Sequence, residues 1–198
     1  MKVNLANRIT IGRLLIPVVF LPLLMAEFPY AKLTALILFL IGTLSDWLDG
    51  YIARKYNMTS DFGRLMDPLA DKILVASALI SFIILVPSIV RAWMVVIIIS
   101  RDFLITGLRL LALGNNHVLS ADTIGKHKTA WQMVAIISVL VFLAYHDIIG
   151  YMPVSMNDCI TAWVPVLLHI LFYLVTGLTL VSGAFYLWRY RDIYYHHV

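Results

Sequence analysis

Six long apolar segments separated by short polar stretches dominate the chain. A helix needs about 20 mostly apolar residues to cross the hydrocarbon core of a bilayer, and most of the segments reach that length. The pattern therefore predicts an all-α integral membrane protein, a bundle of six transmembrane helices. The predicted spans cover residues 11–25, 32–54, 67–86, 92–113, 129–145 and 162–187.

The first thirteen residues are more polar than the segments that follow. On a helix, Leu5 and Ile9 would lie on one side and Asn7 and Arg8 on others, which suits the headgroup level of a membrane. We therefore expect an N-terminal interfacial amphipathic helix over residues 1–13. Since no small-residue cleavage site follows, we do not expect a removable signal peptide.

Composition agrees with a membrane bundle and narrows the function. Hydrophobic residues make up 62% of the chain and charged residues 13%, against about 25% charged in a soluble domain. Six spans fill the 198 residues, so we expect one membrane domain over residues 1–198. The net charge of +4 does not indicate nucleic acid, because no basic patch interleaved with aromatic residues occurs.

Basic residues are distributed unevenly between the two sides of the predicted bundle. Thirteen of the 15 Lys and Arg residues fall on the side with both termini and the connections after the second and fourth spans. Only Lys32 and Arg91 fall on the other side. Because cytoplasmic ends of spans are enriched in Lys and Arg, we expect both termini and the acidic stretch between the second and third spans to face the cytoplasm across a bacterial-type cytoplasmic membrane.

Acidic residues gather where the second and third spans meet. Five of the 11 Asp and Glu residues lie between residues 46 and 71. Asp46 and Asp49 are spaced i, i+3, and Asp67 and Asp71 are spaced i, i+4, so each pair shares a helix face. Two such charges about 5 Å apart repel by roughly 3 kcal/mol at an effective dielectric near 20. The clustering therefore implies a bound cation or shared protons.

The chemistry of this cluster favours hard divalent ions. Four carboxylates without histidine or cysteine suit Mg²⁺ or Mn²⁺ better than zinc, and two ions about 3.5 to 4 Å apart would clamp a diphosphate. Gly42, Gly50 and Ala53 share the face of the first carboxylate pair and would let a helix or ligand approach closely. Helix capping by Asp67 is the alternative, but it would explain one aspartate and not four.

The spacing of these residues resembles the signature of the CDP-alcohol phosphotransferase family, with no departure at its eight positions. The match reads Asp46-x2-Asp49-Gly50-x2-Ala53-Arg54-x8-Gly63-x3-Asp67-x3-Asp71. The resemblance implies six transmembrane helices, a homodimer in membrane lipids and a site for two divalent cations. It also implies transfer of a phosphoalcohol from a CDP-linked donor to an acceptor hydroxyl, with release of CMP.

The resemblance also assigns roles to the signature residues. It makes Asp46, Asp49, Asp67 and Asp71 the metal ligands and Asp71 the catalytic candidate for general base. It implies CDP contacts from Gly50, Ala53, Arg54 and Gly63, with Thr10 and Arg13 closing the nucleotide end. An arginine suits a diphosphate because its guanidinium donates two parallel hydrogen bonds.

Cations in the fourth span and at the start of the fifth point to an anionic acceptor. Arg101 and Arg109 project within about 80° of each other on a helix, and Lys126 and Lys128 follow at the same side of the bundle. Such cations without an obvious carboxylate partner suit a phosphate. The alternative is that Arg101 pairs with Asp102 and the lysines only set orientation.

Outer segments narrow the resemblance to family members that join CDP-diacylglycerol to sn-glycerol 3-phosphate. These segments are NRITIGR (7–13), MDPLADKILV (66–75), SRDFLITGLR (100–109) and GKHKTAWQM (125–133). By this resemblance, the acceptor phosphate meets Arg101, Arg109, Lys126 and Lys128. We expect the acceptor hydroxyl to attack the β-phosphorus of CDP-diacylglycerol directly and in line, without a protein nucleophile. Rival readings are a family member that uses inositol phosphate, phosphatidylglycerol or serine, and a divalent-cation transporter.

Overall fold

A computed structural model describes residues 5–56, 61–114, 123–149 and 157–190, and these form six α-helices and no strand. The helices are α1 (Leu5–Met25), α2 (Ala31–Tyr56), α3 (Asp61–Leu85), α4 (Ala92–Gly114), α5 (Thr123–Ile149) and α6 (Asn157–Arg189). Side chains are described over a narrower range, which leaves out residues 5–11, 13, 46–56, 61–68, 71, 111–114, 123–124, 149 and 157–162. The prediction of an all-α chain is confirmed, and each predicted span coincides with one helix.

Helix boundaries differ from the predictions at several places. Residues 5–25 form one continuous helix, so the boundary predicted between an interfacial helix and the first span is absent from this part of the chain. No proline or turn-forming cluster separates residues 9–14, and a helix continues where nothing interrupts its hydrogen bonds. The loop predicted over residues 55–64 is also shorter, because α2 extends to Tyr56 and α3 begins at Asp61.

Two helices within the described residues are long and apolar enough to cross a membrane by length and composition. These segments are Gly125–Ile148 of α5 and Trp163–Arg189 of α6, and shorter apolar segments occur in α1, α2 and α3. Large apolar side chains such as Val18, Ile84 and Leu167 point outward, each more than half exposed. Outward apolar faces are expected where lipid is the solvent. They agree with a membrane location, while six crossings remain a prediction.

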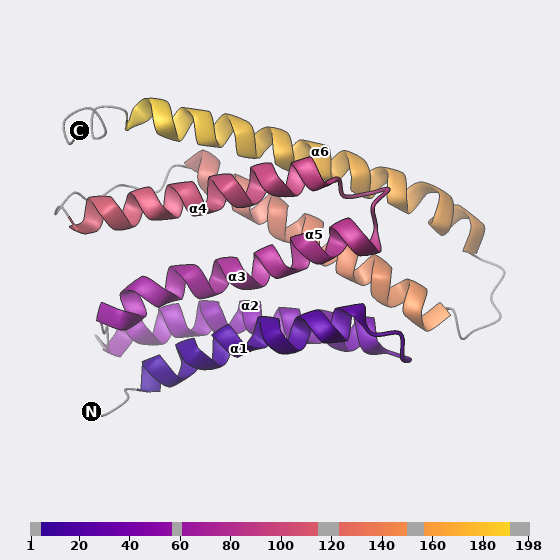
Figure 1. The fold of residues 1–198 in the computed structure, drawn as a ribbon, viewed down its shortest axis with the longest axis horizontal. Coiled ribbons are helices and arrows are strands. Elements are labelled where there is room, and N and C mark those ends of the chain that lie inside the picture. The colour runs from indigo at the N-terminus through magenta and orange to yellow at the C-terminus, as the bar shows by residue number, and fades with distance from the viewer. Residues whose placement is uncertain (1–4, 57–60, 115–122, 150–156, 191–198) are drawn as a thin grey trace.

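The helices are arranged so that the predicted site residues meet at one end of the bundle. α1 packs against α2 and α3, α5 packs against α2 and α6, and α4 lies between α3 and α6 (Figure 1). α2, α4 and α6 end on the left of the view, where α1 and α3 begin (Figure 1). We call this the α2–α3 end. Lys32 and Arg91 lie at the opposite end, close to the first residues of α2 and α4.

An ion pair closes the opposite end of the bundle. The ammonium of Lys32 lies 3.6 Å from a carboxylate oxygen of Asp147, and the backbone N–H of Lys32 donates to the other oxygen at 3.3 Å. The first N–H groups of a helix lack partners within the helix, and an anion beside them is stabilising. Asp147 of α5 therefore caps α2 as well as pairing with its lysine.

A close contact at Gly42 joins the first three helices. A Cβ atom added at Gly42 would lie 2.8 Å from Leu74 of α3 and 3.4 Å from Ile16 of α1. Leu74 is almost fully buried, so it has little room to move away. The predicted close approach of another helix to this face of α2 is thus confirmed at Gly42. In a bilayer, such packing rather than water exclusion holds helices together.

We expect Gly42→Val to lower the free energy of unfolding by about 1 to 3 kcal/mol relative to Gly107→Val, because its side chain would overfill the contact. Gly107 is the matched control, since a Cβ there would meet nothing within 4 Å. Thermal and denaturant unfolding in detergent would measure both. Equal losses for the two variants would contradict the packing at Gly42.

Candidate active site

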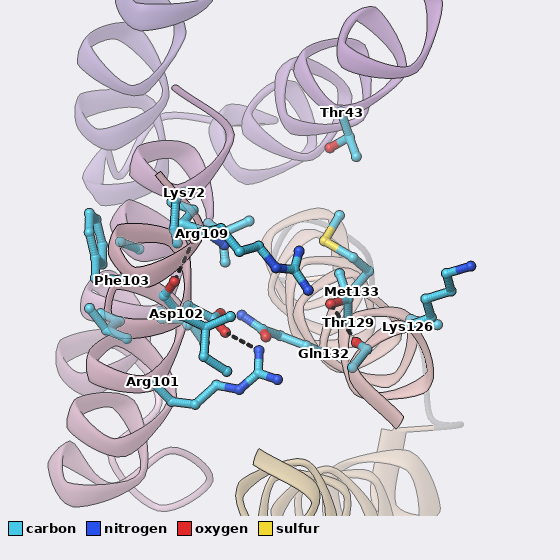
Figure 2. Close-up of a pocket in the computed structure, with 18 residues that line it drawn as sticks. Thr43, Lys72, Arg101, Asp102, Phe103, Arg109, Lys126, Thr129, Gln132 and Met133 are labelled. Carbon is cyan, nitrogen blue, oxygen red and sulfur yellow. Dashed lines mark hydrogen bonds and ion pairs between the residues drawn. The ribbon is translucent and has the colours of Figure 1, made fainter. Parts of the chain in front are cut away.

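A cavity of about 540 Å³ lies among α3, α4 and α5 near the α2–α3 end. Its charged lining residues are four cations and one carboxylate: Lys72, Arg101, Asp102, Arg109 and Lys126. Apolar side chains of α3 and α5 complete its walls, and Thr43 of α2 closes one side (Figure 2). An excess of positive charge in a concave, partly apolar space favours an anionic ligand.

The two arginines reach from α4 toward α5 across this cavity (Figure 2). The Nε atoms of Arg101 and Arg109 are buried and have no hydrogen-bond partner among the described residues. A buried donor without a partner costs about 1 to 3 kcal/mol, so an anion that accepts from these groups would recover that energy. Arg109 also forms no ion pair with a described side chain. Two of the four residues predicted to bind the acceptor phosphate, Arg101 and Arg109, thus reach into one cavity.

Arg101 is tied to a buried network centred on Asp102. Its Nη1 lies 3.2 Å from Oδ1 of Asp102, and the ammonium of Lys128 lies 2.5 Å from the same oxygen. Lys128 also donates to Oε1 of Gln132 at 2.5 Å. The alternative considered for Arg101, a pair with Asp102, is therefore what the structure shows. One carboxylate serves two cations, which leaves a net positive charge.

The two predicted lysine contacts differ in their surroundings. Lys128 is 1% exposed and does not line the cavity, because its ammonium is directed into the network with Asp102 and Gln132. Lys126 is an exposed lining residue whose ammonium extends away from the two arginines (Figure 2). Residues 123–128 are helical rather than part of the predicted loop, and this sets the two side chains on different faces of α5.

Sequence reasoning missed two polar members of the site. Lys72 lines the cavity, and its position directly after Asp71 was the signal that could have found it. Gln132 lies four residues after Lys128, the spacing at which helix side chains meet. Both spacings can be seen in the sequence. They identify site residues only once α4 is known to pack close to α3 and α5.

The predicted metal ligands lie on α2 and α3, and their side chains are outside the described residues. Asp46 lies ten residues before the end of α2 and Asp71 ten residues after the start of α3. At 1.5 Å per residue, each is about 15 Å from its helix end. α2 and α3 run in opposite directions (Figure 1). The two positions are therefore level along the bundle, as are those of Asp49 and Asp67.

The cavity reaches the backbone segments that carry these aspartates. Thr43 lies one turn before Asp46 on α2, and Lys72 directly follows Asp71 on α3, and both line the cavity. The side chains of the predicted CDP contacts are outside the described residues; these are Thr10 and Arg13 on α1, Gly50, Ala53 and Arg54 on α2, and Gly63 on α3. Their helices share the α2–α3 end.

Residues 3–176 match the family model of the CDP-alcohol phosphatidyltransferases. The chain belongs to this family, and the resemblance drawn from its signature is confirmed. Several curated relatives carry the name CDP-diacylglycerol--glycerol-3-phosphate 3-phosphatidyltransferase. The relative from Bacillus subtilis (strain 168) is 39% identical over 160 residues, which cover 75% of this chain and 82% of the relative.

Two further relatives of the same name extend the comparison. The one from Wigglesworthia glossinidia brevipalpis is 38% identical over 149 residues, 71% of this chain and 78% of the relative. The one from Rickettsia bellii (strain RML369-C) is 39% identical over 155 residues, 74% of this chain and 83% of the relative. Each of these alignments covers more than two thirds of the chain, and the family model spans all the residues that line the cation-lined cavity.

We expect Asp102→Asn to lower the free energy of unfolding by about 3 kcal/mol, because it leaves the buried ammonium of Lys128 without a counter-ion. The double variant Asp102→Asn/Lys128→Met removes both charges and should regain much of the loss. Denaturant unfolding in detergent would give the coupling between the two sites. Strictly additive losses would show that the pair does not act as a unit.

Proposed function

We propose that the chain transfers the phosphatidyl group of CDP-diacylglycerol to sn-glycerol 3-phosphate, forming phosphatidylglycerol phosphate and CMP. The observation that carries the proposal is that a cavity lined by Lys72, Arg101 and Arg109 adjoins the segments that bear Asp46 and Asp71. The names of its relatives point to the same reaction. The chain is thus a membrane-associated transferase of phospholipid synthesis.

The cavity supports a phosphorylated acceptor. A phosphate carries two negative charges and accepts bidentate hydrogen bonds, which the guanidinium groups of Arg101 and Arg109 can supply. Serine offers no phosphate to these cations, so it fits the cavity less well. A volume of about 540 Å³ is enough for a glycerol phosphate beside a donor headgroup. Inositol phosphate would suit the same charges, and the names of the relatives favour glycerol phosphate.

Four aspartates at matched depth on α2 and α3 form a donor set that fits two Mg²⁺ or Mn²⁺ ions. Asp46, Asp49, Asp67 and Asp71 would hold them, and the bound ions would neutralise charge on the diphosphate of the donor. Gly50, Ala53, Arg54 and Gly63 would contact the CDP moiety, with Thr10 and Arg13 at its nucleotide end. The signature residues would thus hold the metal ions and the CDP-linked donor.

The chain's own residues would orient the acceptor and take its proton. With the acceptor phosphate held by Arg101 and Arg109, its hydroxyl would approach the position of Asp71, beside Lys72, and Lys126 would add positive charge at the exposed edge of the cavity. Asp71 would accept the proton as the hydroxyl oxygen forms a bond to the β-phosphorus. The bond from that phosphorus to CMP breaks in the same displacement, so no covalent enzyme intermediate is needed. Lys128 would act from behind the cavity, through Asp102.

The proposed membrane arrangement rests on the distribution of basic residues between the two ends of the bundle. We propose that all six helices cross a cytoplasmic membrane as one domain, with both termini and the site on the cytoplasmic side, and that the chain forms a homodimer. Lys32 and Arg91 at the opposite end are two exceptions among 15 basic residues. The acyl chains of the donor would enter between helices from the lipid.

The purified chain should release CMP from CDP-diacylglycerol when glycerol 3-phosphate and Mg²⁺ or Mn²⁺ are present, and chelation should stop the release. Inositol phosphate, serine and phosphatidylglycerol should give little or none, and Asp46→Asn is the inactive control. Activity with another acceptor and none with glycerol 3-phosphate would refute the proposal. Divalent-ion flux in proteoliposomes without CMP release would favour a transporter.

Arg109→Ala should raise the KM for glycerol 3-phosphate at least tenfold and leave the KM for CDP-diacylglycerol unchanged, because a hydrogen bond to a charged group contributes about 1.5 to 3 kcal/mol. Arg91→Ala is the matched control, since Arg91 is exposed at the opposite end. Steady-state kinetics with each substrate varied in turn would separate the two constants. A raised KM for CDP-diacylglycerol with an unchanged acceptor KM would contradict the assignment of Arg109 to the acceptor.

A further inference from the structure

One face of α6 lies behind the two arginines of the cavity. Gly183 and Tyr186 are both buried on α6 and are three residues apart, so they lie on the same face. That face packs against α4, which carries Arg101 and Arg109. Neither residue lines the cavity itself. Any effect on a ligand must therefore pass through the arginines.

Gly183 leaves room for the aliphatic stem of Arg101. A Cβ atom at Gly183 would lie 3.1 Å from Cγ of Arg101, closer than an ordinary van der Waals contact. On the other side, a Cβ at Gly125 of α5 would lie 3.7 Å from Nη2 of the same arginine. Arg101 thus passes between α5 and α6 before it reaches Asp102. A methyl group at Gly183 would require the stem of Arg101 to shift by a few tenths of an ångström.

Tyr186 supports the guanidinium of Arg109. The Cζ atom of Arg109 lies 5.6 Å from the centroid of the Tyr186 ring, within the range of a cation–π contact. Tyr186 is 2% exposed, and its ring also contacts the ring of Tyr190 at 4.7 Å, so it is held firmly. Its hydroxyl has no hydrogen-bond partner in the described part of the chain. The ring, and not the hydroxyl, therefore makes the contact with Arg109.

We propose that Gly183 and Tyr186 are positioning residues that set the directions of Arg101 and Arg109 and thereby tune the affinity for a phosphate-bearing acceptor. The inference rests on the proposed function for the identity of that acceptor. The positioning role of Gly183 and Tyr186 requires only that the two guanidinium groups bind a phosphate, whichever molecule carries it. A bidentate contact depends on direction, so a shift of either side chain weakens it.

Gly183→Ala tests the first contact, with Gly177→Ala as the matched control on the same helix. Both changes exchange glycine for alanine within α6, but a Cβ at Gly177 meets nothing within 4 Å. We expect Gly183→Ala to raise the KM for glycerol 3-phosphate about fivefold, with kcat and the KM for CDP-diacylglycerol within twofold of wild type. Gly177→Ala should match wild type in all three constants.

Tyr186→Leu and Tyr186→Phe test the second contact. Leucine removes the ring, so the acceptor KM should rise about fivefold, whereas phenylalanine keeps the ring and should stay within twofold of wild type. A purely structural role would lower the yield of folded protein without moving the acceptor KM selectively. If the leucine variant does not fold, Gly183→Ala still decides the proposal, because it adds only one methyl group.

The same variants can be compared without turnover, by the thermal shift that inorganic phosphate produces. The apparent Kd for phosphate should rise about fivefold in Gly183→Ala and Tyr186→Leu and stay unchanged in Gly177→Ala and Tyr186→Phe. Wild-type constants in both Gly183→Ala and Tyr186→Leu would overturn the inference. If wild type releases no CMP with glycerol 3-phosphate but the phosphate shifts follow this order, the proposed function fails and the positioning role stands.

Discussion

The burial of positive charge within an apolar bundle is the constraint on which the rest of this structure depends. An isolated charge is costly in such surroundings, and it persists only when it is paired or serves a ligand. Asp102 compensates two cations at once, through contacts to Arg101 and Lys128. Arg109 has an aromatic ring behind it and no acidic partner among the described side chains. This excess of positive over negative charge favours binding of an anion in the cavity.

The second organising feature is the antiparallel pair of α2 and α3. It brings residues that are far apart in sequence to the same depth, and it presents acidic positions beside a cation-lined cavity. The opposite charges of the two regions suit the two halves of the proposed reaction, a diphosphate held through cations and an acceptor phosphate held by arginines. α1 packs on both helices, and the contact at Gly42 fixes their separation.

Much of the fold was predictable because hydrophobic length identifies helices well. The length of an apolar run, however, indicates the part of a helix that lies in the membrane and not its polar ends. The predicted fifth span therefore begins at residue 129, whereas α5 begins at Thr123. The spacing of Arg101 and Arg109 alone was enough to predict that they share a helix face. The burial of Lys128 could not be predicted in this way, because it depends on Asp102 from another helix. Gly183 and Tyr186 sit in a long apolar run, where only the packing of α6 on α4 distinguishes them. The aspartate side chains remain a sequence prediction.

Lys72 follows Asp71 directly, and this adjacency has a consequence for how new specificities could arise. Under the proposed assignment, α3 would contribute to both substrates, so displacing it would disturb donor and acceptor together. α4 and α5 carry the cavity residues proposed to bind the acceptor, and α6 lies behind the arginines of α4. Under the proposed assignment, one alcohol could be exchanged for another by changes at the cavity-lining positions of α4 and α5, while the signature-bearing segments of α2 and α3 stay unchanged.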